Sequence, residues 1–210
     1  MCGRYYVDDE TAVEIEKLLR QMDERRRKES LQAVSRIASG DIYPGKAAPV
    51  LSGQDGSICC KWQYWGFPGF EGKKLVFNAR CESVLEKPMF RDSILHRRIV
   101  IPASWFYEWN SRKEKNTFCR SDMPILFMAG FCRRYEDGEH FVILTTAANA
   151  SMEPVHDRMP LILERQEITE WMFHDAKAEG ILHKTPCLLE RQTDYEQLSF
   201  DILRHSGSIS

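Results

Sequence analysis

The chain has 210 residues, a net charge of −2, 43% apolar residues and 29% charged residues, which is the composition of a globular protein rather than of a disordered or fibrous one. No apolar run approaches the ~18 residues that a membrane-spanning helix needs, and the acidic N-terminal stretch lacks the apolar core of a signal peptide. We therefore expect one domain over residues 1–210, with residues ~195–210 as a loosely ordered tail, and a cytoplasmic location.

Charge is unevenly spread along the chain. Residues 1–134 hold 23 Lys and Arg against 17 Asp and Glu, a balance of +6, whereas residues 135–210 hold 6 against 14, a balance of −8. This asymmetry hints at a polyanion that faces the first part of the chain. Much of it comes from the run Arg25–Lys28, which equally suits the solvated end of a helix.

The first half of the chain alternates helical and extended patterns. Residues 9–28 have the 3.6-residue periodicity of a helix. Asp41–Gly56 is interrupted by proline and glycine and predicts a loop with a short strand. Ile58–Phe67 and Leu75–Ala79 are predicted to be strands, and Ser83–Leu95 to hold one or two short helices.

The second half is dominated by β-forming segments. Ile125–Arg133 and His140–Thr146 predict a hairpin whose turn is Glu136–Glu139. Further strands are predicted at Arg98–Pro102, Phe106–Trp109 and Leu161–Leu163, and short helices at Gln166–Phe173 and Asp175–Leu182. The fold class is therefore α+β, with an antiparallel, barrel-like β core and flanking short helices.

The seven cysteines, at positions 2, 59, 60, 81, 119, 132 and 187, are odd in number and contain no C-x-x-C. We expect no disulfide framework in a reducing compartment. The six histidines form no H-E-x-x-H and no zinc-finger spacing. We therefore expect no metal and no cofactor.

Cys2 is the most informative residue, because removal of Met1 would make it the N-terminus. Cys2 would then carry an α-amine and a thiol on adjacent carbons, with ordinary pKa values of roughly 7.7–8.0 and about 8.5. Such a pair can condense with an aldehyde to an imine and close a five-membered thiazolidine ring. The alternative is that Cys2 is merely a small residue near a frayed end.

Three further residues suit proton transfer or orientation. Glu108 stands among four aromatic residues, where a poorly solvated carboxylate suits a general acid or base; a strand glutamate that faces water is the alternative. His156 could act as a proton shuttle beside an amine and a thiol, or be a structural histidine. Asn78 could orient a sugar or an amine, or be a turn residue.

Four residues could contact nucleic acid. Arg4, Arg80 and Arg158 could each hold a phosphate in a fork, and each could equally be a surface or salt-bridge arginine. Trp65 could stack on an unpaired base, a contact worth ~1–3 kcal/mol, with core packing as the alternative.

Eight ordered blocks of the sequence resemble the SRAP family, the SOS-response-associated peptidases or abasic-site processing proteins. The blocks are M-C-G-R-Y at the start, P-G at Pro44-Gly45, W-G-F-P at Trp65–Pro68, N-A-R-C-E at Asn78–Glu82, K-P-M-F-R at Lys87–Arg91, R-R-I-V-I-P-A-S at Arg97–Ser104, F-Y-E-W at Phe106–Trp109 and H-D-R-M-P at His156–Pro160. The resemblance spans most of the chain, and the last thirty residues add little to it.

The resemblance implies a covalent sensor of abasic sites in single-stranded DNA, working in the bacterial cytoplasm or nucleoid. Cys2, exposed by loss of Met1, would trap the sugar aldehyde as a thiazolidine. The other catalytic residues implied are Asn78, Glu108 and His156. Arg4, Trp65 and Arg80 would contact DNA, with Pro44 and Arg158 as weaker candidates. An imine intermediate would also permit weak β-elimination at the site, and the peptidase label concerns removal of the residue before Cys2.

Two positions depart from the family pattern: Trp105 replaces the glycine usual before F-Y-E-W, and Cys81 follows N-A-R. Two other functions stay open from the residues themselves. One is an N-terminal-cysteine hydrolase that uses Cys2, His156 and Asn78 or Glu108. The other is a non-covalent reader of modified bases with Trp65 and Trp109 as stacking walls. The partner expected is single-stranded DNA with abasic sites, and the protein is expected to be a monomer.

Overall fold

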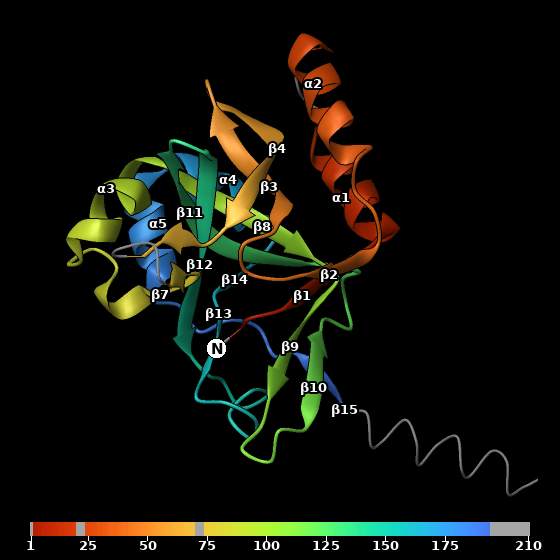
Figure 1. Cartoon of the computed structure of the whole chain (residues 1–210), viewed down its shortest axis with the longest axis vertical. Coiled ribbons are helices and arrows are strands. Elements are labelled where there is room, and N and C mark those ends of the chain that lie inside the picture. The colour runs from red at the N-terminus through yellow and green to blue at the C-terminus, as the bar shows by residue number, and fades with distance from the viewer. Residues whose placement is uncertain (1, 20–23, 70–73, 194–210) are drawn as a thin grey trace, which may run out of the picture.

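The computed structural model describes residues 2–19, 24–69 and 74–193, and its core is a closed β-barrel (Figure 1). Five strands close the ring in the order β3–β4–β12–β11–β8, with β8 returning to β3. The barrel strands are β3 (Ala47–Gln54), β4 (Ser57–Trp65), β8 (Arg98–Ala103), β11 (Leu126–Tyr135) and β12 (Gly138–Ala147). The predicted α+β fold with a barrel-like core is confirmed, although β4 and β12 pair in parallel.

A second sheet lies against one end of the barrel, in the order β15-β10-β9-β1-β2. Its strands are β1 (Tyr5–Val7), β2 (Gly40–Ile42), β9 (Trp105–Trp109), β10 (Lys115–Cys119) and β15 (Glu190–Thr193). Short strands complete the barrel region: β5 (Phe67–Pro68), β6 (Leu75–Val76), β7 (Asn78–Arg80), β13 (Arg158–Pro160) and β14 (Ile162–Leu163).

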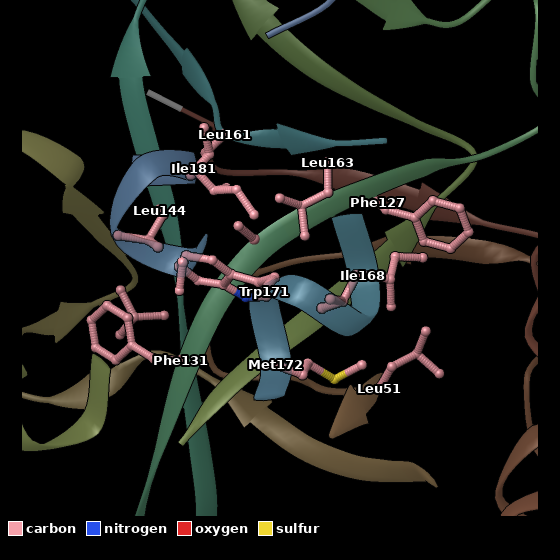
Figure 2. Packing of buried hydrophobic residues seen from close by; sticks show 14 of the residues in the cluster. Leu51, Phe127, Phe131, Leu144, Leu161, Leu163, Ile168, Trp171, Met172 and Ile181 are labelled. Carbon is pink, nitrogen blue, oxygen red and sulfur yellow. The ribbon is translucent and has the colours of Figure 1, made fainter. Parts of the chain in front are cut away.

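The helices pack on the outer face of the barrel. They are α1 (Asp9–Leu19), α2 (Glu24–Val34), α3 (Pro88–His96), α4 (Glu167–Phe173), α5 (Asp175–Leu182) and the 3₁₀ turn η2 (Cys81–Ser83). Trp171 of α4 is fully buried at the centre of this packing, beside Phe127, Leu144 and Leu161 of the barrel side (Figure 2). Its indole Nε1 donates to Ile99 O at 2.9 Å, which fixes α4 to β8.

Two hydrophobic clusters use opposite faces of the same barrel strands. On β12, Val142 and Leu144 belong to the cluster that contains residues of α1 to α5, whereas Phe141 and Ile143 belong to the other. Because side chains alternate across a strand, the second cluster fills the inside of the barrel. Cys2 and Tyr5 belong to that inner cluster.

The structure corrects the predicted single helix over residues 9–28. It contains α1 and α2 instead, and α2 continues to Val34, while residues 20–23 lie outside the described part. Contacts with β4 account for the added length, since Trp62 Nε1 donates to Ala33 O at 2.8 Å and Cys60 N donates to Ser30 Oγ at 3.2 Å. Arg25–Lys28 therefore lies in the first turn of α2 rather than at the C-terminal end of a helix.

The structure also corrects Asp41–Gly56, which is mostly strand β3 rather than loop. Pro49 is tolerated there because β3 pairs with β8 only at Leu51 and Ser52, so Pro49 meets a single partner strand, β4. Strands β10, β13 and β15 were not predicted. The hairpin is confirmed, with Tyr135 opposite Gly138, whose φ of 141° suits glycine. The single-domain assignment stays a prediction, and the predicted tail at ~195–210 lies outside the described residues.

Candidate active site

Cys2 lies just before β1, with 1% of its surface exposed. Asn78 Nδ2 donates to Cys2 O at 2.8 Å, which joins the start of the chain to the start of β7. Burial, followed by the negative charge of Glu108, raises the pKa of the Cys2 thiol to about 12. The thiol is therefore protonated at neutral pH, and it makes a long contact of 3.7 Å to Arg4 O.

Glu108 reaches Cys2 from β9. Tyr5 of β1 pairs with Phe106 of β9, and Tyr107 N donates to Arg4 O at 3.0 Å, so the two strands run side by side (Figure 1). The alternation of β9 turns Glu108 inward, where 6% of it is exposed, whereas Trp109 lies 38% exposed. The structure thus brings together three of the four predicted catalytic residues: Cys2, Asn78 and Glu108.

His156 lies on the loop that leads into β13. Its neighbour Val155 packs against the inner cluster that contains Cys2. Its Nδ1 lies 3.0 Å from Arg158 N and 2.8 Å from Asp157 Oδ1. The ring nitrogen can accept from the first or donate to the second, but it cannot do both at once. These neighbours orient the ring, and the catalytic role of His156 stays a prediction.

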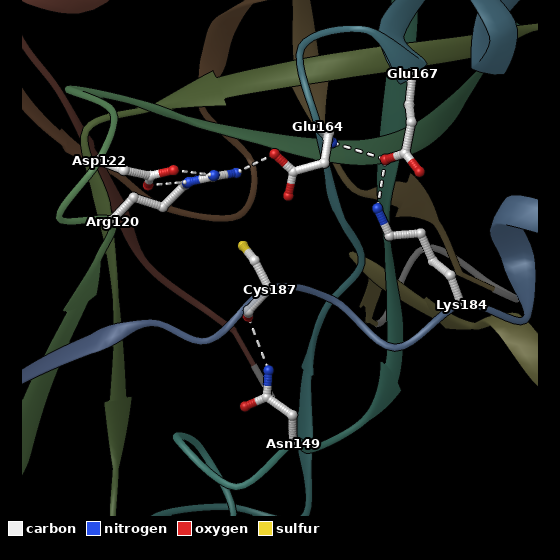
Figure 3. A network of polar contacts seen from close by, with 7 residues as sticks. All are labelled: Arg120, Asp122, Asn149, Glu164, Glu167, Lys184 and Cys187. Carbon is white, nitrogen blue, oxygen red and sulfur yellow. Dashed lines mark hydrogen bonds and ion pairs between the residues drawn. The ribbon is translucent and has the colours of Figure 1, made fainter.

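The loop that carries His156 is anchored by the segment after α5 (Figure 3). Asn149 Nδ2 donates to Pro186 O at 3.0 Å and to Cys187 O at 2.8 Å. The same segment is held to the start of α4, since Lys184 forms an ion pair with Glu167. The position of His156 therefore depends on residues far along the chain.

Arg4 is held tightly on the outer face of the second sheet. Its guanidinium forms an ion pair with Asp41 and lies over two rings, 5.1 Å from the centroid of Tyr43 and 4.7 Å from that of Tyr107. An arginine in this setting is pre-positioned, with a quarter of its side chain exposed. A phosphate at Arg4 would have to share the guanidinium with Asp41.

Arg158 is committed to a structural contact. Its guanidinium donates to both carboxylate oxygens of Glu82, at 2.6 and 2.9 Å, and to Thr145 O at 2.6 Å. This bidentate pair lowers the pKa of Glu82 and ties η2 to β13 across β12. The DNA contact of Arg158 stays a prediction, and a phosphate there would have to compete with Glu82 for the guanidinium.

Trp65 is fully buried, so the structure places it where no base can stack on its ring. Its Nε1 donates to Phe77 O at 2.9 Å, and its ring contacts Tyr5 with centroids 5.0 Å apart. The predicted stacking role is corrected to core packing, because a flat indole fills the barrel beside Cys2 and leaves no free face.

The contacts of Arg80 and Pro44 with DNA stay predictions. Arg80 ends β7 with an exposed side chain, and no hydrogen bond or ion pair joins that side chain to another described residue. Pro44 is half-buried in the turn after β2, where Gly45 N donates to Trp65 O at 2.6 Å.

Three residues that sequence reasoning missed belong to the site. Tyr5 is buried in the same inner cluster as Cys2. The ring of Tyr107 lies under the guanidinium of Arg4, and the carboxylate of Glu82 accepts hydrogen bonds from Arg158. Alternation along β1 could have indicated that Tyr5 faces inward with Val7. Within the described ranges, no three His, Cys, Asp or Glu residues are grouped as a metal site, and no helix is long and apolar enough to cross a membrane.

Cys2 thus belongs to the inner cluster of a closed barrel, with the amide of Asn78 on its carbonyl and the carboxylate of Glu108 near its thiol. The chain belongs to the SRAP family, since the family model for SOS response associated peptidase matches residues 1–200.

Its curated relatives carry a consistent name. It is 29% identical over 180 residues to the abasic site processing protein YedK of Escherichia coli, covering 82% of this chain and 79% of that protein. It is 36% identical over 110 residues to YoqW of Bacillus subtilis, another abasic site processing protein, covering 48% of this chain and 49% of that one.

Solved structures share the fold. A protein from Bacteroides thetaiotaomicron superposes with a TM-score of 0.73 at 22% identity, covering 91% of both chains. A phage-related protein from Bordetella bronchiseptica has a TM-score of 0.73 at 20% identity, covering 91% of this chain and 93% of that one.

Proposed function

We propose that the protein captures abasic sites in single-stranded DNA by forming a thiazolidine through Cys2 after Met1 is removed. The observation that carries the proposal is the grouping at the N-terminus: Asn78 holds the Cys2 carbonyl at 2.8 Å, and Glu108 lies near enough to the thiol to raise its pKa. The names of the curated relatives support the same substrate class.

The chemistry follows two steps. The neutral α-amine of Cys2 attacks the aldehyde carbon of the opened sugar, and loss of water gives an imine. The sulfur then adds to the same carbon, forming a C–S bond as the imine π electrons pass to nitrogen, which takes a proton. Glu108 accepts and returns protons at the amine, and His156 donates one to the ring oxygen as the sugar opens. The imine also permits slow β-elimination, a weak lyase activity.

The raised pKa of Cys2 argues for this order of events. With Met1 attached, burial raises the pKa of this thiol to about 12, so we take the α-amine that removal of Met1 exposes as the first nucleophile. A cysteine hydrolase needs the opposite, a thiolate stabilised by a contacting base. The alternative function, non-covalent binding of modified bases, is disfavoured because Trp65, one of its two expected stacking residues, is buried.

The test uses single-stranded DNA with one abasic site, separated on a denaturing gel after incubation with protein whose mass shows loss of Met1. Wild type should give a heat-resistant shifted band, whereas Cys2→Ala should give none. Cys119→Ser, a cysteine half-buried on β10, is the matched control and should crosslink normally. A variant with one alanine inserted between Met1 and Cys2 keeps the thiol but removes its free amine, and should also give no band.

Other results would count against the proposal. A band that survives Cys2→Ala would move the covalent bond elsewhere, and the absence of a band from processed wild type would contradict covalent capture. Mass measurement of protein expressed with Glu108→Gln tests self-processing, because retained Met1 would assign that carboxylate to removal of the first residue.

A further inference from the structure

Tyr5 is a buried residue whose phenol oxygen has no hydrogen-bond partner in the structure. Its side chain is fully enclosed, with 0% exposed. Leaving a buried hydroxyl unpaired costs about 1–3 kcal/mol, and phenylalanine would fill the same space without that cost. An uncompensated hydroxyl at this position calls for an explanation.

A chain of contacts through Asn78, Phe77 and Trp65 links Cys2 to Tyr5. Asn78 Nδ2 donates to Cys2 O at 2.8 Å, and Trp65 Nε1 donates at 2.9 Å to the carbonyl of Phe77, the neighbour of Asn78. The Trp65 ring then contacts the Tyr5 ring, with centroids 5.0 Å apart. Cys2 and Tyr5 share the inner cluster, and a thiolate at Cys2 would lie close enough to raise the pKa of the Tyr5 hydroxyl.

The proposed reaction places negative charge on the Cys2 sulfur, which a nearby hydroxyl can stabilise by donating a hydrogen bond. When the thiol of Cys2 loses its proton, negative charge develops on a buried sulfur that also faces the carboxylate of Glu108. Asn78 Nδ2 already donates to the Cys2 carbonyl, so it does not serve the sulfur. The Tyr5 O–H is an uncommitted donor in the same enclosure. Burial raises the pKa of Tyr5 well above its usual value, so the phenol keeps its proton.

We propose that Tyr5 donates a hydrogen bond to the sulfur of Cys2 as the thiazolidine ring closes and reopens. The inference rests on the proposed function and adds a residue to it. In closure, the thiol proton passes to the imine nitrogen, the C–S bond forms and the C=N π bond breaks. In reopening, the C–S bond breaks and the sulfur leaves with its electron pair. Tyr5 keeps its own proton in both directions and stabilises the charged sulfur.

Tyr5→Phe removes one oxygen and keeps the ring against Trp65. The rate of crosslink formation should fall about tenfold, the equivalent of one hydrogen bond to a charged atom. The thermal midpoint should stay the same or rise, because an unpaired hydroxyl is lost. Tyr64→Phe is the matched control, since Tyr64 lies 41% exposed on β4 and should leave the rate unchanged.

A second measurement needs no DNA. Alkylation of Cys2 by iodoacetamide, followed by mass spectrometry of the N-terminal peptide of the processed protein, reports thiolate formation against pH. Loss of a donor to the thiolate raises the thiol pKa, so Tyr5→Phe should shift the alkaline rise in alkylation to higher pH. A purely structural hydroxyl would leave that profile in place.

Each outcome decides one question. A wild-type rate of crosslinking in Tyr5→Phe, or an unshifted alkylation profile, overturns the role of Tyr5. A lower thermal midpoint in Tyr5→Phe also overturns it, because the hydroxyl would then have a structural partner. Failure of wild type to crosslink contradicts the proposed function instead, while the alkylation profile still tests the contact between Tyr5 and Cys2.

Discussion

The outer face of the barrel and the region around Cys2 differ in how far their buried polar groups are hydrogen-bonded. On the outer face, Arg98 donates to the carbonyls of Trp171, Ile94 and Leu95 and to Asp175, which joins α3, α4 and α5 to β8. Near the N-terminus, the Tyr5 hydroxyl and Asn78 Oδ1 are buried with no partner. Satisfied groups hold helices in place, whereas unsatisfied groups mark where a ligand completes the structure. We expect stability to depend on the outer face and chemistry on the inner one.

The largest expected effect is on the outer face, from Trp171→Ala. Deleting a fully buried indole and its bond to Ile99 O should lower the free energy of unfolding by about 3–5 kcal/mol. Urea unfolding measures this loss, and Trp109→Ala, which truncates a 38% exposed ring, should cost far less. Equal losses in the two variants would mean that the helices do not depend on this packing.

Arg98→Met should have the next largest effect. The guanidinium is 6% exposed, and its loss leaves three carbonyls without donors, for an expected cost of about 2–3 kcal/mol. Asp175→Asn should cost less than about 1 kcal/mol, because Asp175 is 80% exposed. Parallel urea titrations compare the two variants, and a larger loss from Asp175→Asn would show that the ion pair, rather than the carbonyl bonds, holds these helices to β8.

Asn78→Ala tests the inner face, where we expect activity to change more than stability. Loss of the amide that holds Cys2 O should slow crosslinking about tenfold and lower the free energy of unfolding by about 1 kcal/mol. Timed gel assays and urea unfolding of the same preparation give both numbers. An unchanged crosslinking rate with a large stability loss would assign Asn78 to the scaffold.

The sequence predicted the barrel class and most long strands because these segments have their own signals. Ile125–Arg133 and His140–Thr146 are strongly β-forming and share a short turn, and they appear as β11 and β12. The length of β3 was underestimated because Pro49 and Gly53 resemble loop residues, and only the pairing of β3 with β4 makes them strand. Local propensity cannot report such a tertiary pairing.

In the candidate site too, the sequence predicted some features, whereas others depend on tertiary contacts. Cys2, Asn78 and Glu108 could be named from motifs and are brought together by β1, β7 and β9. Burial could not be predicted for Trp65 or ion pairing for Arg158, because motif letters carry no information about which way a side chain points. Glu82 was part of a quoted motif, but its partner lies 76 positions away along the chain.

The smallest expected effects separate two arginines that the sequence names as candidate DNA contacts. Arg80 is exposed at the end of β7, so Arg80→Ala should weaken binding to undamaged single-stranded DNA a few-fold and reduce the salt slope by about one phosphate contact. Arg158→Ala should leave the salt slope unchanged and instead lower stability, because Glu82 and Thr145 O lose their donor. Fluorescence anisotropy across a salt series measures both slopes. A reduced slope in Arg158→Ala would mean that DNA displaces Glu82 from the guanidinium, and the contact would then be a switch between protein and phosphate.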